Sequence, residues 1–177
     1  MIAKLSKYKD IPKASIFLSG SKSESNRLLV LQALYPDIEI ANIAFCDDTT
    51  VLQKALASQE DMLDIHHAGT AMRFLTAYLA ATTQKEITLT GSPSMLQRPI
   101  GPLVAALRGM GAAITYTGKQ GYPPLKIAPA ALSGNVTIDA SVSSQYISAL
   151  ALIGPYLKKG LTLTLTGNIT SKPYIDM

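Results

Sequence analysis

The chain has 177 residues, of which 47% are hydrophobic and 16% charged, so it is long enough and apolar enough to bury the core of one domain, and disorder is excluded. Its net charge of +4 comes from 16 basic residues spread along the sequence, which argues against a broad nucleic-acid-binding face and suits small anionic ligands. The single Cys46 has no partner for an internal disulfide, in keeping with a reducing cytoplasm, and the sequence predicts neither a secretion signal nor a membrane span.

One pattern occurs at least three times along the chain: a short strand, a turn of glycine and hydroxyl residues, and an amphipathic helix. The three copies lie at residues 14–34, 85–110 and 135–157. Repeated strand and helix pairs are typical of α/β or α+β proteins. We therefore expect a fold of repeated βα units.

Further elements are expected between and after these copies. Asp47 and Asp48 are plausible caps for a helix over residues 49–58, and Ala68-Gly69 opens a second helix that runs through Thr82. Alternating apolar and polar residues indicate additional strands, some of them in antiparallel pairs. These strands are expected at residues 112–117, 125–128 and 161–166.

The first turn, residues 19–27, reads Ser-Gly-Ser-Lys-Ser-Glu-Ser-Asn-Arg and stands where a strand gives way to a helix. A helix N-terminus offers unpaired N–H groups and a partial positive charge. Lys22 adds a point charge and Arg27 a planar fork for two oxygens of one anion. This turn is suited to a phosphate, although a serine-rich cap with solvated charges explains the window equally well when it is taken alone.

Two later turns carry groups of the same kind. Gly69 allows a close backbone approach to a ligand, Thr70 adds a hydroxyl, and Arg73 follows one turn into the helix. Pro99 is expected in the first turn of the next helix. Arg98 would then lie at the N-terminus of that helix, where its guanidinium could hold an anion.

A fourth turn brings Ser143, Ser144 and Gln145 to the start of a helix, where serines are also good caps.

His66 and His67 are neighbours in the sequence, and such a pair suggests a metal site only superficially. Because the sequence offers no spaced third ligand, no metal site is predicted.

Five motifs in fixed order resemble the enolpyruvyl transferase family, in the branch that acts on shikimate 3-phosphate, and cover essentially the whole chain. They are GSKSESNR at 20–27, AGTAMRF at 68–74, QRPIGPLVAALRGMGA at 97–112, SSQYISAL at 143–150 and SKPYIDM at 171–177. Compared with the usual family residues, His67 replaces an asparagine, Phe74 a proline and Ser94 an arginine.

The resemblance implies an enzyme of aromatic amino acid biosynthesis. It would transfer the enolpyruvyl group of phosphoenolpyruvate to the 5-hydroxyl of shikimate 3-phosphate, through a tetrahedral adduct that expels inorganic phosphate. No metal or organic cofactor is implied, and the partners are these two small molecules, not nucleic acid or membrane. The resemblance further implies a cytoplasmic enzyme that is monomeric at full length.

The resemblance also assigns roles to single residues. Lys22 would be catalytic and touch both substrates, while Ser23 and Arg27 would hold the phosphoshikimate. Phosphoenolpyruvate would meet Gly69, Arg98 and Gln145. The phosphate and ring hydroxyls of the phosphoshikimate would be held by Ser143, Ser144, Gln145, Ser171 and Tyr174.

Family members are roughly twice as long and have two similar halves, each made of three βαβαββ units. By resemblance, residues 1–13 form a strand that belongs with the other half, and residues 14–177 form an incomplete substrate-binding domain. Because the family takes its acid and base groups from the other half, the chain is expected to bind phosphoshikimate weakly and to lack turnover.

Two other classes remain open on the residues alone. A non-catalytic module that binds phosphorylated metabolites would keep the same anion-holding turns. The net positive charge and the scattered tyrosines suggest a nucleic-acid binder. Base stacking, however, needs aromatic residues gathered on one face, which argues against this class.

Overall fold

The computed structural model describes residues 3–4, 6–7 and 13–177. Within these residues no helix has both the length and the apolar character needed to cross a bilayer. The elements follow in the order α1 (Lys22–Leu34), α2 (Asp47–Ala57), β1 (Met62–Asp64), α3 (Gly69–Thr82), β2 (Ile87–Thr90), α4 (Gly101–Gly109), β3 (Ala113–Tyr116), β4 (Leu125–Ala128), β5 (Asn135–Asp139), α5 (Ser144–Ile153), the short 3₁₀ helix η1 (Gly154–Tyr156), β6 (Thr162–Thr166) and α6 (Lys172–Asp176).

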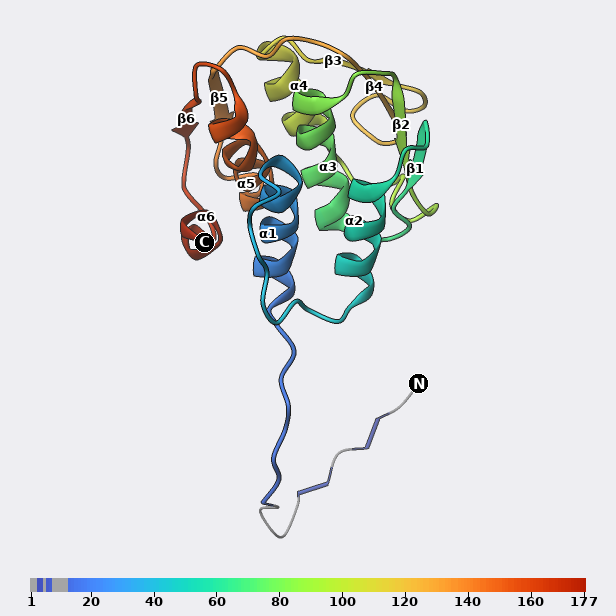
Figure 1. Ribbon diagram of the computed structural model, residues 1–177, viewed down its shortest axis with the longest axis vertical. Helices are drawn as coiled ribbons and strands as arrows, with labels where there is room; N and C mark the ends of the chain where they lie inside the picture. Colours follow the sequence, from blue (N-terminus) through green and yellow to red (C-terminus); the bar gives the residue numbers. More distant parts are fainter. Residues whose placement is uncertain (1–2, 5, 8–12) are drawn as a thin grey trace.

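The strands form two sheets on opposite sides of a group of helices (Figure 1). In the four-stranded sheet, ordered β1-β2-β4-β3, β1 and β2 are parallel and the other neighbours are antiparallel. Strands β5 and β6 form a separate parallel pair. Residues 62–128 thus make one complete βαβαββ unit, and β5-α5-β6-α6 repeats its first four elements. The α/β fold with repeated units is confirmed.

Helix α3 is the centre of the core. It packs against α1, α2, α4 and α5, and also against strands β2 and β4. Ten of its fourteen residues are buried, and Phe74 and Leu75 are almost completely enclosed. A helix that is apolar on most sides is stable only when neighbours cover all of them. Because α3 is held on every side, the position of its first turn is determined by the core.

The helices and strands expected in the second and third copies are confirmed, with differences at helix starts. Helix α2 begins at Asp47 and has Cys46 as its cap residue, so both aspartates lie inside the first turn, where they complement the helix dipole.

The prediction that Pro99 lies in the first turn of a helix is wrong, because Pro99 precedes α4, which begins at Gly101. The amides of Ile100 and Gly101 donate to the carbonyl of Gly121, which holds the chain in a turn there, and Pro102 takes the first-turn position.

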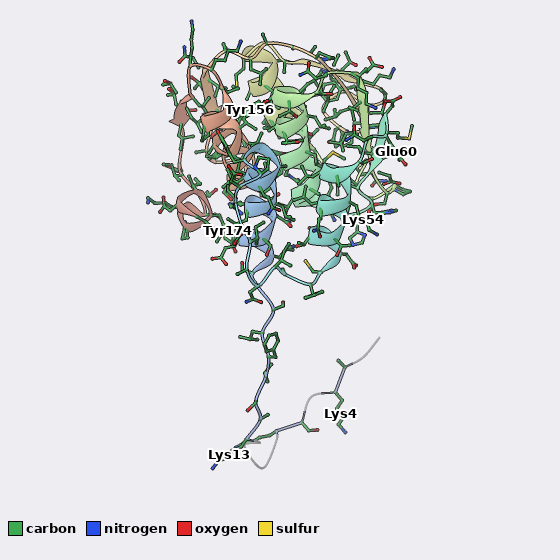
Figure 2. The ribbon with its side chains drawn as sticks, viewed as in Figure 1. Lys4, Lys13, Lys54, Glu60, Tyr156 and Tyr174 are labelled. Carbon is green, nitrogen blue, oxygen red and sulfur yellow. The ribbon has the colours of Figure 1, made fainter. Side chains whose placement is uncertain are left out.

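The strand expected at the start of the first copy is not formed. Residues 13–20 are extended but have no strand partner among the described residues, and Ile16, Phe17 and Leu18 are 79%, 95% and 76% exposed. Figure 2 shows Lys13 at the far end of this segment, well away from the helices. The strand expected over residues 1–13 lies mostly outside the described residues.

Candidate functional site

The first turns of α1, α3 and α5 meet at one hollow of about 320 Å³. These three helices lie side by side and run in the same direction (Figure 1). Each helix N-terminus presents unpaired N–H groups and a partial positive charge, so their convergence creates a site for an anion. The hollow is lined by Lys22, Ser23, Arg27, Thr70, Ser144, Gln145, Ser171 and Tyr174.

Seven of these eight residues were predicted as site residues from the sequence, and the other three predicted residues lie next to the hollow. Ser143 caps α5 by accepting a hydrogen bond from the Gln145 amide at 3.3 Å. Gly69 directly precedes Thr70 in α3. Arg98 reaches Gly69, as described below. The structure therefore brings all of the predicted positions into one neighbourhood.

Arg27 is the most buried cation of the hollow, with 7% of its surface exposed. Its Nη1 donates to the Ser23 carbonyl at 2.9 Å, and its Nη2 donates to Ser148 Oγ at 2.8 Å and to the Tyr174 carbonyl at 2.7 Å. All three acceptors are neutral. Burial lowers the pKa of the Arg27 guanidinium, and a smaller electrostatic effect of Tyr174 raises it. Because no described carboxylate pairs with Arg27, its buried charge favours an anionic ligand.

Lys22 stands at the mouth of the hollow and is half exposed. Its Nζ lies 3.6 Å from Asp48 Oδ1, which comes from the first turn of α2. This contact leaves the lysine close to the hollow without burying its charge. An anion that enters the hollow would compete with Asp48 for the ammonium group.

Gly69 is a point of close approach for two guanidinium groups. A Cβ atom at this position would stand 2.9 Å from Nη1 of Arg73 and 2.9 Å from Nη1 of Arg98. Arg73 Nη1 donates to the Gly69 carbonyl at 2.6 Å, and neither arginine forms an ion pair with a carboxylate in the part of the chain that is described. Two cations at a helix N-terminus form a second place where an anion would be stabilised.

Gln145 and Thr70 join the two places. Gln145 Nε2 donates to Thr70 Oγ1 at 3.4 Å across the gap between α5 and α3. Ser171 adopts a left-handed conformation with φ of 53° at the start of α6. Tyr174, labelled in Figure 2, belongs to α6, and its carbonyl accepts a hydrogen bond from Arg27 of α1. The hydroxyl and amide groups around the hollow can therefore contact the polar ring of a ligand whose charged group is held by the cations.

Sequence reasoning noted Thr70 and Arg73 without including them in the site, and it missed the supporting residues Tyr146 and Ser148. Tyr146 OH donates to the Pro99 carbonyl at 2.7 Å, and Ser148 Oγ accepts from Arg27. Both belong to α5, whose inward face looks like ordinary core in the sequence. No local sequence pattern indicates that a buried hydroxyl group forms a hydrogen bond with a residue far away along the chain, as Ser148 does with Arg27.

The rest of the described surface offers weaker alternatives. His66 and His67 lie beside a different hollow, and nowhere in the described ranges do three histidine, cysteine or acidic side chains gather as metal ligands. A larger groove of about 460 Å³ between α1 and α5 shares Arg27 with the hollow but is mainly apolar, which does not suit a phosphate. It is lined by Glu24, Arg27, Leu28, Leu31, Ser148, Ala151, Leu152, Ile175 and Met177.

Comparison with known proteins identifies what the chain is similar to. Residues 47–177 match the family described as EPSP synthase (3-phosphoshikimate 1-carboxyvinyltransferase). A 3-phosphoshikimate 1-carboxyvinyltransferase of Bacteroides fragilis is 53% identical over 167 residues, which cover 93% of this chain and 40% of the relative. One from Colwellia psychrerythraea is 41% identical over 190 residues, covering 92% of this chain and 44% of the relative.

Solved structures agree on the fold. An EPSP synthase from Acinetobacter baumannii superimposes with a TM-score of 0.73 at 21% identity, over 91% of this chain and 42% of its own. A second structure from that organism gives a TM-score of 0.74 at 22% identity. The chain spans about 40% of the length of the curated relatives that it matches, so the predicted resemblance to only a part of the family's length is confirmed.

Proposed function

Because the chain belongs to the EPSP synthase family, we propose that it carries the shikimate 3-phosphate site and part of the phosphoenolpyruvate site of a cytoplasmic 3-phosphoshikimate 1-carboxyvinyltransferase. The single observation that carries this proposal is the hollow at the first turns of α1, α3 and α5, which holds Lys22 and the buried Arg27. A phosphorylated, hydroxylated ring matches this combination of cations, helix N-termini and hydroxyl groups.

In this proposal the two substrates occupy adjoining places. The phosphate of shikimate 3-phosphate lies among Ser143, Ser144, Ser171 and the edge of Arg27, and the ring hydroxyls meet Gln145 and Tyr174. Phosphoenolpyruvate lies at the start of α3, against the Gly69 amide and the Arg98 guanidinium. Lys22 stands at the mouth of the hollow, where its ammonium group can contact both substrates.

The proposed reaction has two steps, the addition of the hydroxyl to phosphoenolpyruvate and the loss of inorganic phosphate. The 5-hydroxyl of the phosphoshikimate gives its proton to a base as its oxygen adds to C2 of phosphoenolpyruvate, and C3 gains a proton from an acid, which gives a tetrahedral adduct. The adduct loses inorganic phosphate from C2 and a proton from C3, and the enol ether product forms. Lys22 and Arg98 would stabilise negative charge on the phosphate as its bond to C2 breaks. The acid and base groups would come from the part of the family's length that this chain does not span.

The expected affinity of the chain alone is modest. Two or three charge-assisted hydrogen bonds of about 2 kcal/mol each give about 4 to 6 kcal/mol, which corresponds to dissociation constants from about millimolar to tens of micromolar before ordering costs. Weak binding without turnover is therefore the expected behaviour. A phosphometabolite-binding module with no enzymatic parent is a poorer explanation, because the sequence relatives carry the name of a transferase.

Isothermal titration calorimetry with shikimate 3-phosphate, and with shikimate as the unphosphorylated control, tests the proposal. We expect binding of the phosphate ester and at least tenfold weaker binding of shikimate, since about 1.5 kcal/mol or more is lost with the phosphate contacts. Equal binding of the two ligands, or binding of neither, would contradict the phosphate site. If the chain alone, given both substrates, releases inorganic phosphate from phosphoenolpyruvate, the assignment of the acid and base groups is contradicted.

A further inference from the structure

Tyr146 connects the two turns that surround Gly69. Its side chain comes from α5 and is almost completely buried, with 3% exposed. Its hydroxyl donates at 2.7 Å to the carbonyl of Pro99, the residue that follows Arg98. The Arg73 guanidinium lies over its ring, with 5.7 Å between Arg73 Cζ and the ring centroid. One buried side chain therefore contacts both the arginine that grips Gly69 and the turn that carries Arg98.

The cations around Gly69 need such support. Arg73 and Arg98 approach the same point beside Gly69, and like charges repel. Arg73 Nε is buried and has no hydrogen-bond partner among the described residues, so the hold on this guanidinium comes from the Gly69 carbonyl and the face of Tyr146. Arg98 is exposed, and its backbone amide is tied to Met95. Without a fixed turn, Arg98 would be free to move away from its like-charged neighbour.

We propose that Tyr146 is a positioning residue that holds Gly69 and Arg98 in the geometry of one anion-binding site. The inference rests on the proposed function, since it assigns to Tyr146 the support of the place next to the hollow where phosphoenolpyruvate is proposed to bind. The ring stabilises Arg73 and, through it, the first turn of α3, while the hydroxyl fixes the backbone of Pro99, the residue after Arg98. Tyr146 does not line the hollow itself.

The arrangement assigns separate supports to the hollow and to the adjoining place at Gly69 and Arg98. Arg27, on the phosphoshikimate side, is held by hydrogen bonds to Ser23, Ser148 and Tyr174, and none of them involves Tyr146. Loss of the Tyr146 hydroxyl should therefore weaken one ligand and spare the other. A residue that only filled the core would affect both ligands alike, through general stability.

The variant Tyr146→Phe removes only the hydroxyl, and Tyr116→Phe is its matched control. Tyr116 also carries an arginine on its ring, with Arg108 Cζ 4.9 Å from the centroid, but it lies on β3 and does not line the hollow. The ¹H–¹⁵N signals of the Gly69 amide and of Arg98 Nε are recorded without ligand. Phosphoenolpyruvate and shikimate 3-phosphate are then titrated separately into the wild-type chain and each variant.

For Tyr146→Phe we expect shifted Gly69 and Arg98 signals and an increase of about threefold to tenfold in the phosphoenolpyruvate dissociation constant, from the loss of one buried hydrogen bond. The affinity for shikimate 3-phosphate should stay within about twofold of wild type, as it should for both ligands in Tyr116→Phe. A wild-type chain that binds both ligands, with Tyr146→Phe indistinguishable from it, would overturn this inference alone. A wild-type chain that binds neither ligand would contradict the proposed function, and the inference with it.

Discussion

The guanidinium of Arg27 lies over the ring of Phe74, with 5.5 Å between Arg27 Cζ and the ring centroid. Arg27 comes from α1 and Phe74 from the buried face of α3. The ring thus covers one face of a cation that has only neutral hydrogen-bond acceptors around it, and an aromatic face stabilises such a charge without neutralising it. The charge remains available to an anion in the hollow.

Replacement of Arg27 by methionine separates binding from stability. A buried charge replaced by an apolar side chain of similar size usually changes stability little, and Ser148 Oγ already donates to the Tyr174 carbonyl at 3.0 Å, so it keeps a partner. We expect the free energy of unfolding to change by less than about 1 kcal/mol, and the affinity for shikimate 3-phosphate to fall about tenfold or more. Urea denaturation and calorimetry measure the two effects.

Arg108→Met is the matched control for Arg27→Met, because Arg108 also lies over an aromatic ring but is remote from the lining of the hollow. Its affinity for shikimate 3-phosphate should equal that of the wild-type chain. Unchanged affinity in Arg27→Met would show that the buried guanidinium does not contact the ligand.

Phe74→Leu should destabilise the chain. Phe74 is 1% exposed in the central helix, so a smaller side chain leaves unfilled space and also removes the ring beneath Arg27. We expect the free energy of unfolding to fall by about 1 to 2 kcal/mol. Phe45→Leu is the control, because Phe45 is 91% exposed and should change stability by less than about 0.5 kcal/mol. Equal stability of the two variants in urea would contradict the packing described for α3.

Asp48→Asn should strengthen ligand binding. The Asp48 carboxylate lies 3.6 Å from Lys22 and competes with an incoming anion for the ammonium group. Its removal should raise the affinity for shikimate 3-phosphate about twofold to threefold, while the loss of this partly exposed ion pair should cost less than about 1 kcal/mol of stability. Asp47→Asn is the neighbouring control, since Asp47 lies near His67, 3.9 Å away, and does not line the hollow. The same gain in both variants would point to net charge and not to Lys22.

Asp139 provides a test by pH. Hydrogen bonds from the Ser141 hydroxyl and amide lower the pKa of the Asp139 carboxyl from its usual value. Because the folded-state pKa is the lower one, the stabilisation is present at neutral pH and is lost as pH falls through that pKa. Ser141→Ala removes the hydroxyl donor but keeps the amide, so the pKa should rise part of the way back. A carboxyl ¹³C titration measures it, and an unchanged pKa would exclude the hydroxyl as a cause.

Local signals in the sequence were sufficient for much of the fold. The start of α3 follows from Gly69, and the run of alternating residues at 161–166 predicts β6, which spans Thr162–Thr166. Strand β1 was not predicted, because its three residues include only one buried side chain and are too few to show alternation. The short helix α6 was missed because it follows Ser171, whose left-handed conformation has no clear signature in the sequence.

The candidate site could be predicted as a set of residues but not as an arrangement. Motifs at helix starts identified the cations and hydroxyl groups, since helix N-termini are local features. The hydrogen bonds that hold these groups in place join residues far apart in the sequence. Arg27 and Ser148 are 121 positions apart, and Tyr146 and Pro99 are 47 positions apart. The strand expected at the start of the copy at residues 14–34 is not formed for the same reason, because strand formation depends on a neighbouring strand and not on the segment alone.

Chemical-shift mapping with shikimate 3-phosphate on the ¹⁵N-labelled chain is the most direct measurement of whether the three helix N-termini form one anion site. We predict saturable shifts at Lys22, at the Arg27 side chain and at residues 143–145, with little change on the four-stranded sheet. Saturable shifts confined to other surfaces, or none at these residues, would contradict the account.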